Sequence, residues 1–261
     1  MDYEKQYQEY LVRVNRALDA ACEKFLPEES EVCRAARYSL LGGGKRIRAV
    51  LVLAVCDMLD GNAEAAEQFA AAVEMLHCYS LIHDDLPCMD NDDLRRGKPS
   101  CHKAFGESTA MLAGDVLLTE AFNVIANASA SPEICVRAAK ALGAGAGSHG
   151  MVYGQELDLK YEALAATEEQ LRLIHRHKTG ALINAPSRWA QQRRRRPRRR
   201  AKSWKLMLTA SASCFRSSMM CWMWSARRSS SASPSAVTAK TARRLSSPCS
   251  VRTAQWSWQR N

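Results

Sequence analysis

The sequence predicts an all-α helical bundle over residues 1–185, followed by a tail of different character. Apolar residues recur at three-to-four spacing in this part, which is the period of an amphipathic helix. Glycines and capping residues interrupt the pattern where helices are expected to begin and end. Strand-like alternation is not persuasive before Ala185, and no repeat of solenoid length occurs. One bundle of helices is therefore the economical architecture.

Four helices are expected first, and their apolar periodicity covers residues 7–25, 32–41, 47–59 and 65–82. The glycine run 42–44 and Gly61 follow the second and third of these, and glycine is common just past a helix end. Further on, Ser131-Pro132-Glu133 has the cap, first-turn proline and acidic first turn of a helix start. Thr167-Glu168-Glu169-Gln170 is a capping box that leads into a last helix over residues 171–185.

Composition places limits on the kind of protein. The chain has 261 residues and 47% hydrophobic residues, enough for one sizeable core or two small ones, and it is neither collagenous nor mucin-like. The longest uninterrupted apolar run, residues 49–56, is far shorter than the roughly 20 residues that span a bilayer. The start Met-Asp-Tyr-Glu lacks a signal pattern, and the ten cysteines contain no C-x-x-C pair. We expect a soluble cytoplasmic protein with reduced thiols and no membrane partner.

Charge divides the chain near Ala185. Residues 1–185 hold all 27 acidic residues, all 13 glycines and 19 Lys+Arg, for a net charge of −8. Residues 186–261 hold no Asp, Glu or Gly, with 18 Lys+Arg, and they contain all six tryptophans. This half offers little periodic apolar surface, so we expect a disordered, low-complexity basic tail.

One segment of the first half carries the chemistry: His83-Asp-Asp-Leu-Pro-Cys-Met-Asp-Asn-Asp-Asp-Leu-Arg-Arg-Gly-Lys-Pro99. Its carboxylates repel one another unless a cation neutralises them, and Mg²⁺ prefers one or two carboxylates together with substrate phosphates. Asp84 and Asp90 are the candidate ligands. Pro87 cannot continue the helix and should bring these two carboxylates toward one ion. Arg95 and Arg96 offer planar donor groups that suit phosphate oxygens.

The alternative interpretation is a solvated acidic loop whose Asp and Arg residues pair with each other. A second cluster, Gly42-Gly-Gly-Lys-Arg-Ile-Arg48, weighs against it because a helix start with free N–H groups favours phosphate. Alone the glycine run is weak, since it lacks the spacing and preceding strand of a P-loop.

Together these motifs resemble those of the short-chain trans-prenyltransferases of the polyprenyl synthetase family, close to the bacterial type of farnesyl diphosphate synthase. The match includes residues 43–48, the aspartate-rich segment, Gly154-Gln155-Glu156-Leu157-Asp158 and Lys178-Thr179-Gly180, and it spans residues 1–185. The resemblance implies an isoprenoid synthase bundle around a deep cavity, incomplete in this chain. It also implies a homodimer in the intact protein, and two aspartate-rich motifs that face each other.

The resemblance also implies roles for individual residues. Asp84 and Asp90 would bind Mg²⁺ on the allylic diphosphate, with Asp85 in support and Arg95 on the same diphosphate. Isopentenyl diphosphate would be held by Lys45, Arg48, His77 and Arg96. Lys178 would help to withdraw the leaving diphosphate, and the backbone near Thr179 would stabilise the allylic carbocation. Tyr79, five residues before Asp84, would floor the product pocket and stop products near farnesyl.

Several of these residues have ordinary interpretations as well. His77 is equally well a satisfied helix histidine, and Tyr79 a core aromatic. Gln155 and Asp158 read as exposed helix positions, and Lys178 as a common surface lysine. None of these four interpretations needs a ligand.

The tail departs from the family. Met219-Met-Cys-Trp-Met-Trp224 back-translates almost uniquely, and a reading one nucleotide earlier yields x-Asp-Val-Leu-Asp-Val, the core of the missing second motif. A one-nucleotide shift near Ala185 therefore explains residues 186–261 as out-of-frame translation. We expect the chain as written to be inactive and to aggregate or behave as a molten bundle, because its helices lose apolar partners.

Two other functions stand beside the prenyltransferase. The chain could be a catalytically dead remnant that captures diphosphates with Mg²⁺ without condensing them. It could instead bind nucleic acid through the arginine-rich tail, since basic stretches with interspersed tryptophan neutralise phosphates and stack bases. Nothing in residues 1–185 suggests a nucleic-acid partner, which weighs against this function.

Overall fold

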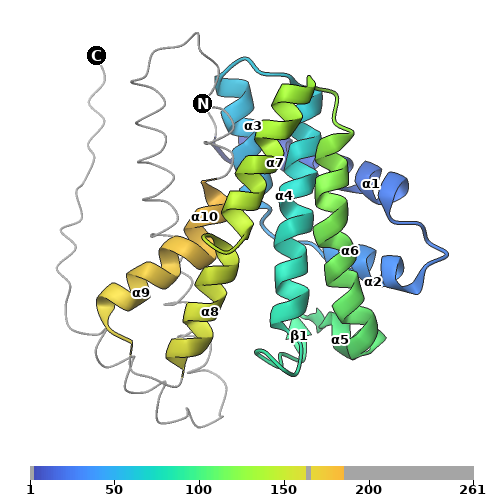
Figure 1. The fold of residues 1–261 in the computed structure, drawn as a ribbon. Coiled ribbons are helices and arrows are strands. Elements are labelled where there is room, and N and C mark those ends of the chain that lie inside the picture. The colour runs from blue at the N-terminus through green and yellow to red at the C-terminus, as the bar shows by residue number, and fades with distance from the viewer. Residues whose placement is uncertain (1–2, 163–165, 185–261) are drawn as a thin grey trace.

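The computed structural model describes residues 3–162 and 166–184, which form a bundle of helices (Figure 1). Within this part the only strands are the two-residue antiparallel pair β1 (Leu94–Arg95) and β2 (Lys98–Pro99). The predicted all-α class is therefore confirmed here. The predicted basic tail, residues 186–261, lies outside the described residues.

The first four expected helices are present as α1 (Tyr3–Phe25), α2 (Glu31–Leu40), α3 (Ile47–Met58) and α4 (Ala63–Asp84). Side chains cap two of them: Ser30 Oγ accepts from the Cys33 N–H at 3.3 Å, and Asn62 Oδ1 accepts from the Ala65 N–H at 3.2 Å. These bonds satisfy N–H groups that have no partner inside the helix.

The second half of the described chain begins after the β1–β2 hairpin. Its helices are α5 (Cys101–Phe105), α6 (Glu107–Ala126), α7 (Pro132–Ala146), α8 (Met151–Glu162), α9 (Glu168–Ile174), the π-helix η1 (His175–Gly180) and α10 (Ala181–Ile183). Pro132 lies in the first turn of α7, and both hydrogen bonds of the Thr167–Gln170 capping box are present, as predicted. The expectation of one regular helix over 171–185 is wrong, because η1 interrupts it.

The core lies between α4 and α6, which run side by side through the middle of the bundle (Figure 1). Leu76 and Leu117 are fully buried there, together with many alanines that let the two helices approach closely. Helix α6 is the one described helix that is long and apolar enough, by length and composition, to cross a membrane. It packs against α4, α2 and α5, as a central helix of a soluble bundle also would.

The C-terminal end of α4 lies at the end of the bundle that also carries the β1–β2 hairpin and α5 (Figure 1). Helix α8 packs against η1, and both approach this end through contacts of their side chains with Asp84. Segments far apart in the sequence are thus brought together around the aspartate-rich loop.

Candidate functional site

The aspartate-rich segment begins where α4 ends. Asp84 is the last residue of α4, and the chain then folds into a tight turn that contains Pro87. The N–H of Asp90 donates to the carbonyl oxygen of Asp84 at 2.8 Å, so the turn closes on itself. The backbones of the two predicted ligands are therefore adjacent, although six positions separate them in the sequence.

Two side chains from distant elements hold the Asp84 carboxylate. Gln155 of α8 donates from Nε2 to Asp84 Oδ1, and Lys178 Nζ of η1 lies 3.9 Å from Asp84 Oδ2. Lys178 also donates to Asp158 Oδ2 at 2.5 Å. Asp84 itself is only 12% exposed in its side chain. The carboxylate is thus fixed in a nearly buried position at the junction of α4, α8 and η1.

Burial raises the pKa of Asp84 to about 6. The Lys178 ammonium lowers this pKa, and the neighbouring carboxylates of Asp90 and Asp85 raise it. A cation placed between Asp84 and Asp90 would relieve this repulsion.

The donors present fit Mg²⁺ held jointly with a diphosphate. No group of three His, Cys, Asp or Glu side chains in the described residues is arranged to hold a metal by itself. The Asp84–Asp90 turn offers two carboxylates, which is the number that Mg²⁺ usually takes from a protein when substrate phosphates complete its shell.

The predicted alternative, in which Asp and Arg residues of the loop pair with each other, is realised at Arg95. Its guanidinium binds both oxygens of the buried Asp85 carboxylate and also donates to Asp92 Oδ2 at 3.1 Å. Arg95 is therefore held by carboxylates in this structure, and its predicted contact with the allylic diphosphate remains a prediction. Asp84 is not part of that pairing.

A second group of predicted residues converges on His77. The Arg48 Nη1–H donates to His77 Nε2 at 3.2 Å, and His77 Nδ1 is buried without a hydrogen-bond partner among the described residues. Burial lowers the pKa of His77 well below its usual value, and the nearby positive charges of Arg48 and Arg96 lower it further. The imidazole is therefore neutral, and the positive charge around it favours an anion.

Arg96 joins this group from the hairpin. It adopts a left-handed backbone with φ of 56° and donates from Nη1 to the Gly43 carbonyl oxygen. This bond ties the glycine loop to the aspartate-rich loop. Burial lowers the pKa of Arg96, and the positive charges of Arg46 and Arg95 act in the same direction. Lys45 lies in the same loop and is exposed, and its carbonyl oxygen accepts a 2.5 Å hydrogen bond from Tyr7.

Arg46 departs from the expectation that residues 42–48 form an anion-seeking cluster throughout. Its side chain is turned into the core, where Nη1 lies 3.7 Å from Glu74 Oε2 and Nη2 donates to the Leu40 carbonyl oxygen at 2.6 Å. Both charged side chains are almost fully buried, 3% and 2% exposed. Arg46 is therefore a structural residue, and only Lys45 and Arg48 of this cluster are left for an anion.

The π-helix carries Lys178, which reaches Asp84, and Thr179 is the next residue of the same helix. Gly154 of α8 lies directly against this segment, because a Cβ at that position would stand 2.0 Å from the Lys178 backbone nitrogen. Close approach of α8 to η1 thus requires glycine at 154. Thr179 is buried, 8% exposed, and the role predicted for its backbone stays a prediction.

Tyr79 lies five residues before Asp84 on α4. Its ring is 8% exposed and meets the His83 imidazole edge-on, with 5.7 Å between the ring centroids. Burial raises the pKa of Tyr79, and the negative charge of Asp84 raises it further. The structure thus places Tyr79 against His83, and its predicted role at the floor of the product pocket stays a prediction.

Gln155 and Asp158 contribute to the site although the sequence argument gave neither a specific role. From spacing alone they read as ordinary exposed helix positions. Their three-residue separation puts both on one face of α8, and that face meets η1. Only the packing of α8 against η1 identifies them as partners of Asp84 and Lys178.

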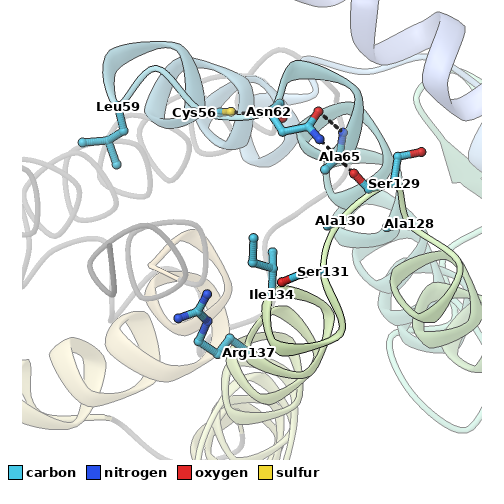
Figure 2. A pocket seen from close by; sticks show the side chains of 11 residues that line it. Cys56, Leu59, Asn62, Ala65, Ala128, Ser129, Ala130, Ser131, Ile134 and Arg137 are labelled. Carbon is cyan, nitrogen blue, oxygen red and sulfur yellow. Dashed lines mark hydrogen bonds between the residues drawn. The ribbon is translucent and has the colours of Figure 1, made fainter. Parts of the chain in front are cut away.

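A cavity of about 530 Å³ lies at the opposite end of α4, between the α3–α4 turn and the start of α7 (Figure 2). Apolar side chains such as Leu59 and Ile134 line it, and Asn62 donates across its rim to the Ser129 carbonyl oxygen at 2.8 Å. Among the described residues that line it, Arg137 is the one charged residue. The described lining thus offers no carboxylate for a metal ion and no pair of cations for a diphosphate.

Comparison with known proteins identifies the family of the chain. Residues 29–216 match the family model described as polyprenyl synthetase. The chain is 50% identical over 177 residues to a farnesyl diphosphate synthase of Micrococcus luteus, covering 68% of this chain and 60% of that protein. It is 51% identical over 179 residues to a heterodimeric geranylgeranyl pyrophosphate synthase large subunit of Arabidopsis thaliana, covering 66% of this chain and 48% of that one.

Solved structures agree with these matches. A geranyltransferase from Legionella pneumophila superposes with a TM-score of 0.76 at 37% identity, covering 80% of this chain and 74% of that one. An FPP/GFPP synthase from Zymomonas mobilis superposes with a TM-score of 0.68 at 35% identity, covering 79% and 76%. The chain spans about half the length of the curated relatives that it matches.

Proposed function

The chain belongs to the polyprenyl synthetase family, and we propose on that premise that its intact form is a Mg²⁺-dependent prenyltransferase. It would condense isopentenyl diphosphate with an allylic diphosphate, either dimethylallyl or geranyl, and yield farnesyl diphosphate. The observation that carries the proposal is the nearly buried Asp84 carboxylate, joined to Asp90 by the closed turn and faced by Gln155 and Lys178.

Each group of the site has a task in this reaction. Asp84 and Asp90 would hold Mg²⁺, which supplies positive charge for the leaving diphosphate. Asp158 positions Lys178 so that the Lys178 ammonium lies beside the Asp84 carboxylate. Lys45, Arg48, His77 and Arg96 would bind isopentenyl diphosphate, with neutral His77 as part of the cradle. Thr179 lies in the buried part of η1, where its backbone would face the developing carbocation.

Farnesyl is proposed as the product, and Tyr79 is the residue that sets it. Relatives of similar identity are described as farnesyl and as geranylgeranyl synthases, so identity alone does not select a chain length. The buried aromatic ring of Tyr79, five residues before Asp84, supports the shorter product, because a ring at this place would block a growing prenyl chain.

The chain as written is proposed to bind without turnover. All 27 acidic residues lie in residues 1–185, so the tail supplies no carboxylate for a second aspartate-rich motif. This observation favours the second function, a remnant that captures a diphosphate with Mg²⁺ through Asp84 and Asp90. The prenyltransferase activity then belongs to a chain whose reading frame is restored after Ala185, which we call the frame-restored chain.

The test is a turnover assay with labelled isopentenyl diphosphate, geranyl diphosphate and Mg²⁺. The frame-restored chain is expected to produce labelled farnesyl diphosphate, and the chain as written to produce none. An inactive frame-restored chain that is folded would refute the prenyltransferase proposal. Turnover by the chain as written would refute the binding-only proposal. Resequencing the gene across the codons for residues 183–188 identifies which chain the organism makes.

We also propose that the intact protein is a cytoplasmic homodimer. The seven cysteines among the described residues are all free, which suits a reducing compartment. Exposed Met111 and Leu112 on α6 offer apolar surface to a second copy. Light scattering of the frame-restored chain, and fractionation of cells that express it, test these two statements.

A further inference from the structure

The imidazole of His83, the residue that precedes Asp84, packs directly on the backbone of helix α6 at a contact that we call the seat. Gly114 of α6 lies under the His83 imidazole, and a Cβ at Gly114 would stand 2.1 Å from His83 Nε2 and 2.4 Å from its Cδ2. The same nitrogen lies 2.9 Å from the Met111 carbonyl oxygen, to which its N–H donates. It also lies 3.9 Å from Asp115 Oδ1. The imidazole thus rests on a bare patch of α6 backbone and bonds to it.

The backbone of His83 anchors the aspartate-rich turn. Its carbonyl oxygen accepts from the Leu86 N–H at 3.2 Å, and the Leu86 carbonyl oxygen in turn accepts from the Met89 N–H at 2.8 Å. The next residue, Asp84, accepts from the Asp90 N–H through its carbonyl oxygen. A helix end has few intrahelical bonds and frays easily. Fixing His83 on α6 therefore fixes the last turn of α4 and the loop that follows it.

We propose that His83 is a positioning residue: its imidazole, seated over Gly114 and bonded to Met111, holds the α4 end so that Asp84 and Asp90 form the divalent-metal site. The same seat sets the Tyr79 ring, which contacts the imidazole edge-on at 5.7 Å. The position of Gly114 on α6 thus fixes both the Asp84–Asp90 turn and Tyr79, the residue proposed to limit product length. This inference rests on the proposed function, because it assigns a role toward that metal.

The test measures Mn²⁺ binding to the chain as written by electron paramagnetic resonance, with Mn²⁺ alone as the probe. Gly114→Ala places a methyl group where the imidazole sits and should weaken Mn²⁺ binding about tenfold. His83→Ala removes the imidazole and should weaken binding by a similar factor. In the double variant the methyl group meets no imidazole, so binding should be no weaker than in His83→Ala alone.

Controls separate positioning from general damage. Gly143→Ala on α7 is the matched change, since its nearest neighbour would be Phe122 Cζ at 4.0 Å, and it should bind Mn²⁺ as the original chain does. His83→Gln keeps a donor for the Met111 carbonyl oxygen and should recover much of the affinity lost in His83→Ala. Circular dichroism of each variant reports whether helix content is kept.

The outcomes separate the inference from its premise. If the original chain does not bind Mn²⁺, the proposed metal site and this inference both fail. If it binds Mn²⁺ and His83→Ala binds equally well, the inference alone is overturned. The same holds if Gly114→Ala weakens binding equally with and without His83. Should Gly114→Ala not fold, the comparison of His83→Ala with His83→Gln decides the question.

Discussion

The pH dependence of metal binding follows from Asp84, whose pKa burial raises to about 6. A divalent ion competes with the proton for this carboxylate, so metal affinity should rise as pH increases through about 6 and fall as pH decreases. This pH dependence is opposite to that of an anion site built on a histidine, where protonation strengthens binding. The experiment varies the pH and keeps the ionic strength constant.

The expected magnitude follows from the fraction of Asp84 that is ionised. With a pKa of about 6, roughly nine-tenths of the carboxylate is ionised near pH 7 and roughly one-tenth near pH 5. The Mn²⁺ dissociation constant should therefore be about tenfold larger near pH 5 than near pH 7. A carboxylate with the ordinary value of 3.8 would remain mostly ionised near pH 5 and give little change.

The assay is a Mn²⁺ titration near both pH values, followed by electron paramagnetic resonance. Asp84→Asn is the control, because the amide has no proton to lose, and its binding should be weak and nearly independent of pH. In Lys178→Met, loss of the cation that lowers the Asp84 pKa should move the midpoint to higher pH. A change of less than about twofold in the original chain would refute the reasoning, since Asp84 would not be a buried ligand.

Other predictions concern the packing and the product. In the frame-restored chain, Gly154→Ala should lower the free energy of unfolding by about 1–3 kcal/mol, because the new Cβ would clash with the backbone of Lys178. Urea denaturation measures this change, with Gly143→Ala as the control variant. Equal urea midpoints for the two variants would contradict the prediction. Tyr79→Ala in that chain should lengthen the products seen by mass spectrometry, and unchanged products would exclude the pocket-floor role. The chain as written should unfold over a broad temperature range by circular dichroism, because its helices lose apolar partners, whereas a sharp transition with monodisperse scattering would oppose this expectation.

The helices were predictable because their signals are local. Apolar periodicity, Ser30 and Asn62 as caps and the Thr167–Gln170 capping box act within one or two helical turns. The β1–β2 hairpin was missed because two-residue strands are too short to show alternation. The π-helix η1 was missed as well, because π-helices are rare and occur mostly as single turns inside α-helices, so the sequence pattern predicted a regular helix there.

The site was predictable as far as residue chemistry and chain proximity define it. Asp84, Asp90 and the turn at Pro87 are neighbours in the sequence, and the closed turn brings their backbones together. Gln155 has no such signal, because its partner lies 71 positions away. Arg46 illustrates the reverse case: next to Lys45 and Arg48 it reads as a phosphate binder, but its buried partner Glu74 draws it into the core.

The most direct test of the account is whether Asp84 and Asp90 capture a diphosphate with Mg²⁺ in the chain as it exists. Isothermal titration calorimetry would compare the binding of geranyl diphosphate with and without Mg²⁺, in the original chain and in the Asp84→Asn/Asp90→Asn variant. The account predicts binding that requires Mg²⁺ and is lost in the variant. Binding of equal strength without Mg²⁺, or in the variant, would contradict it.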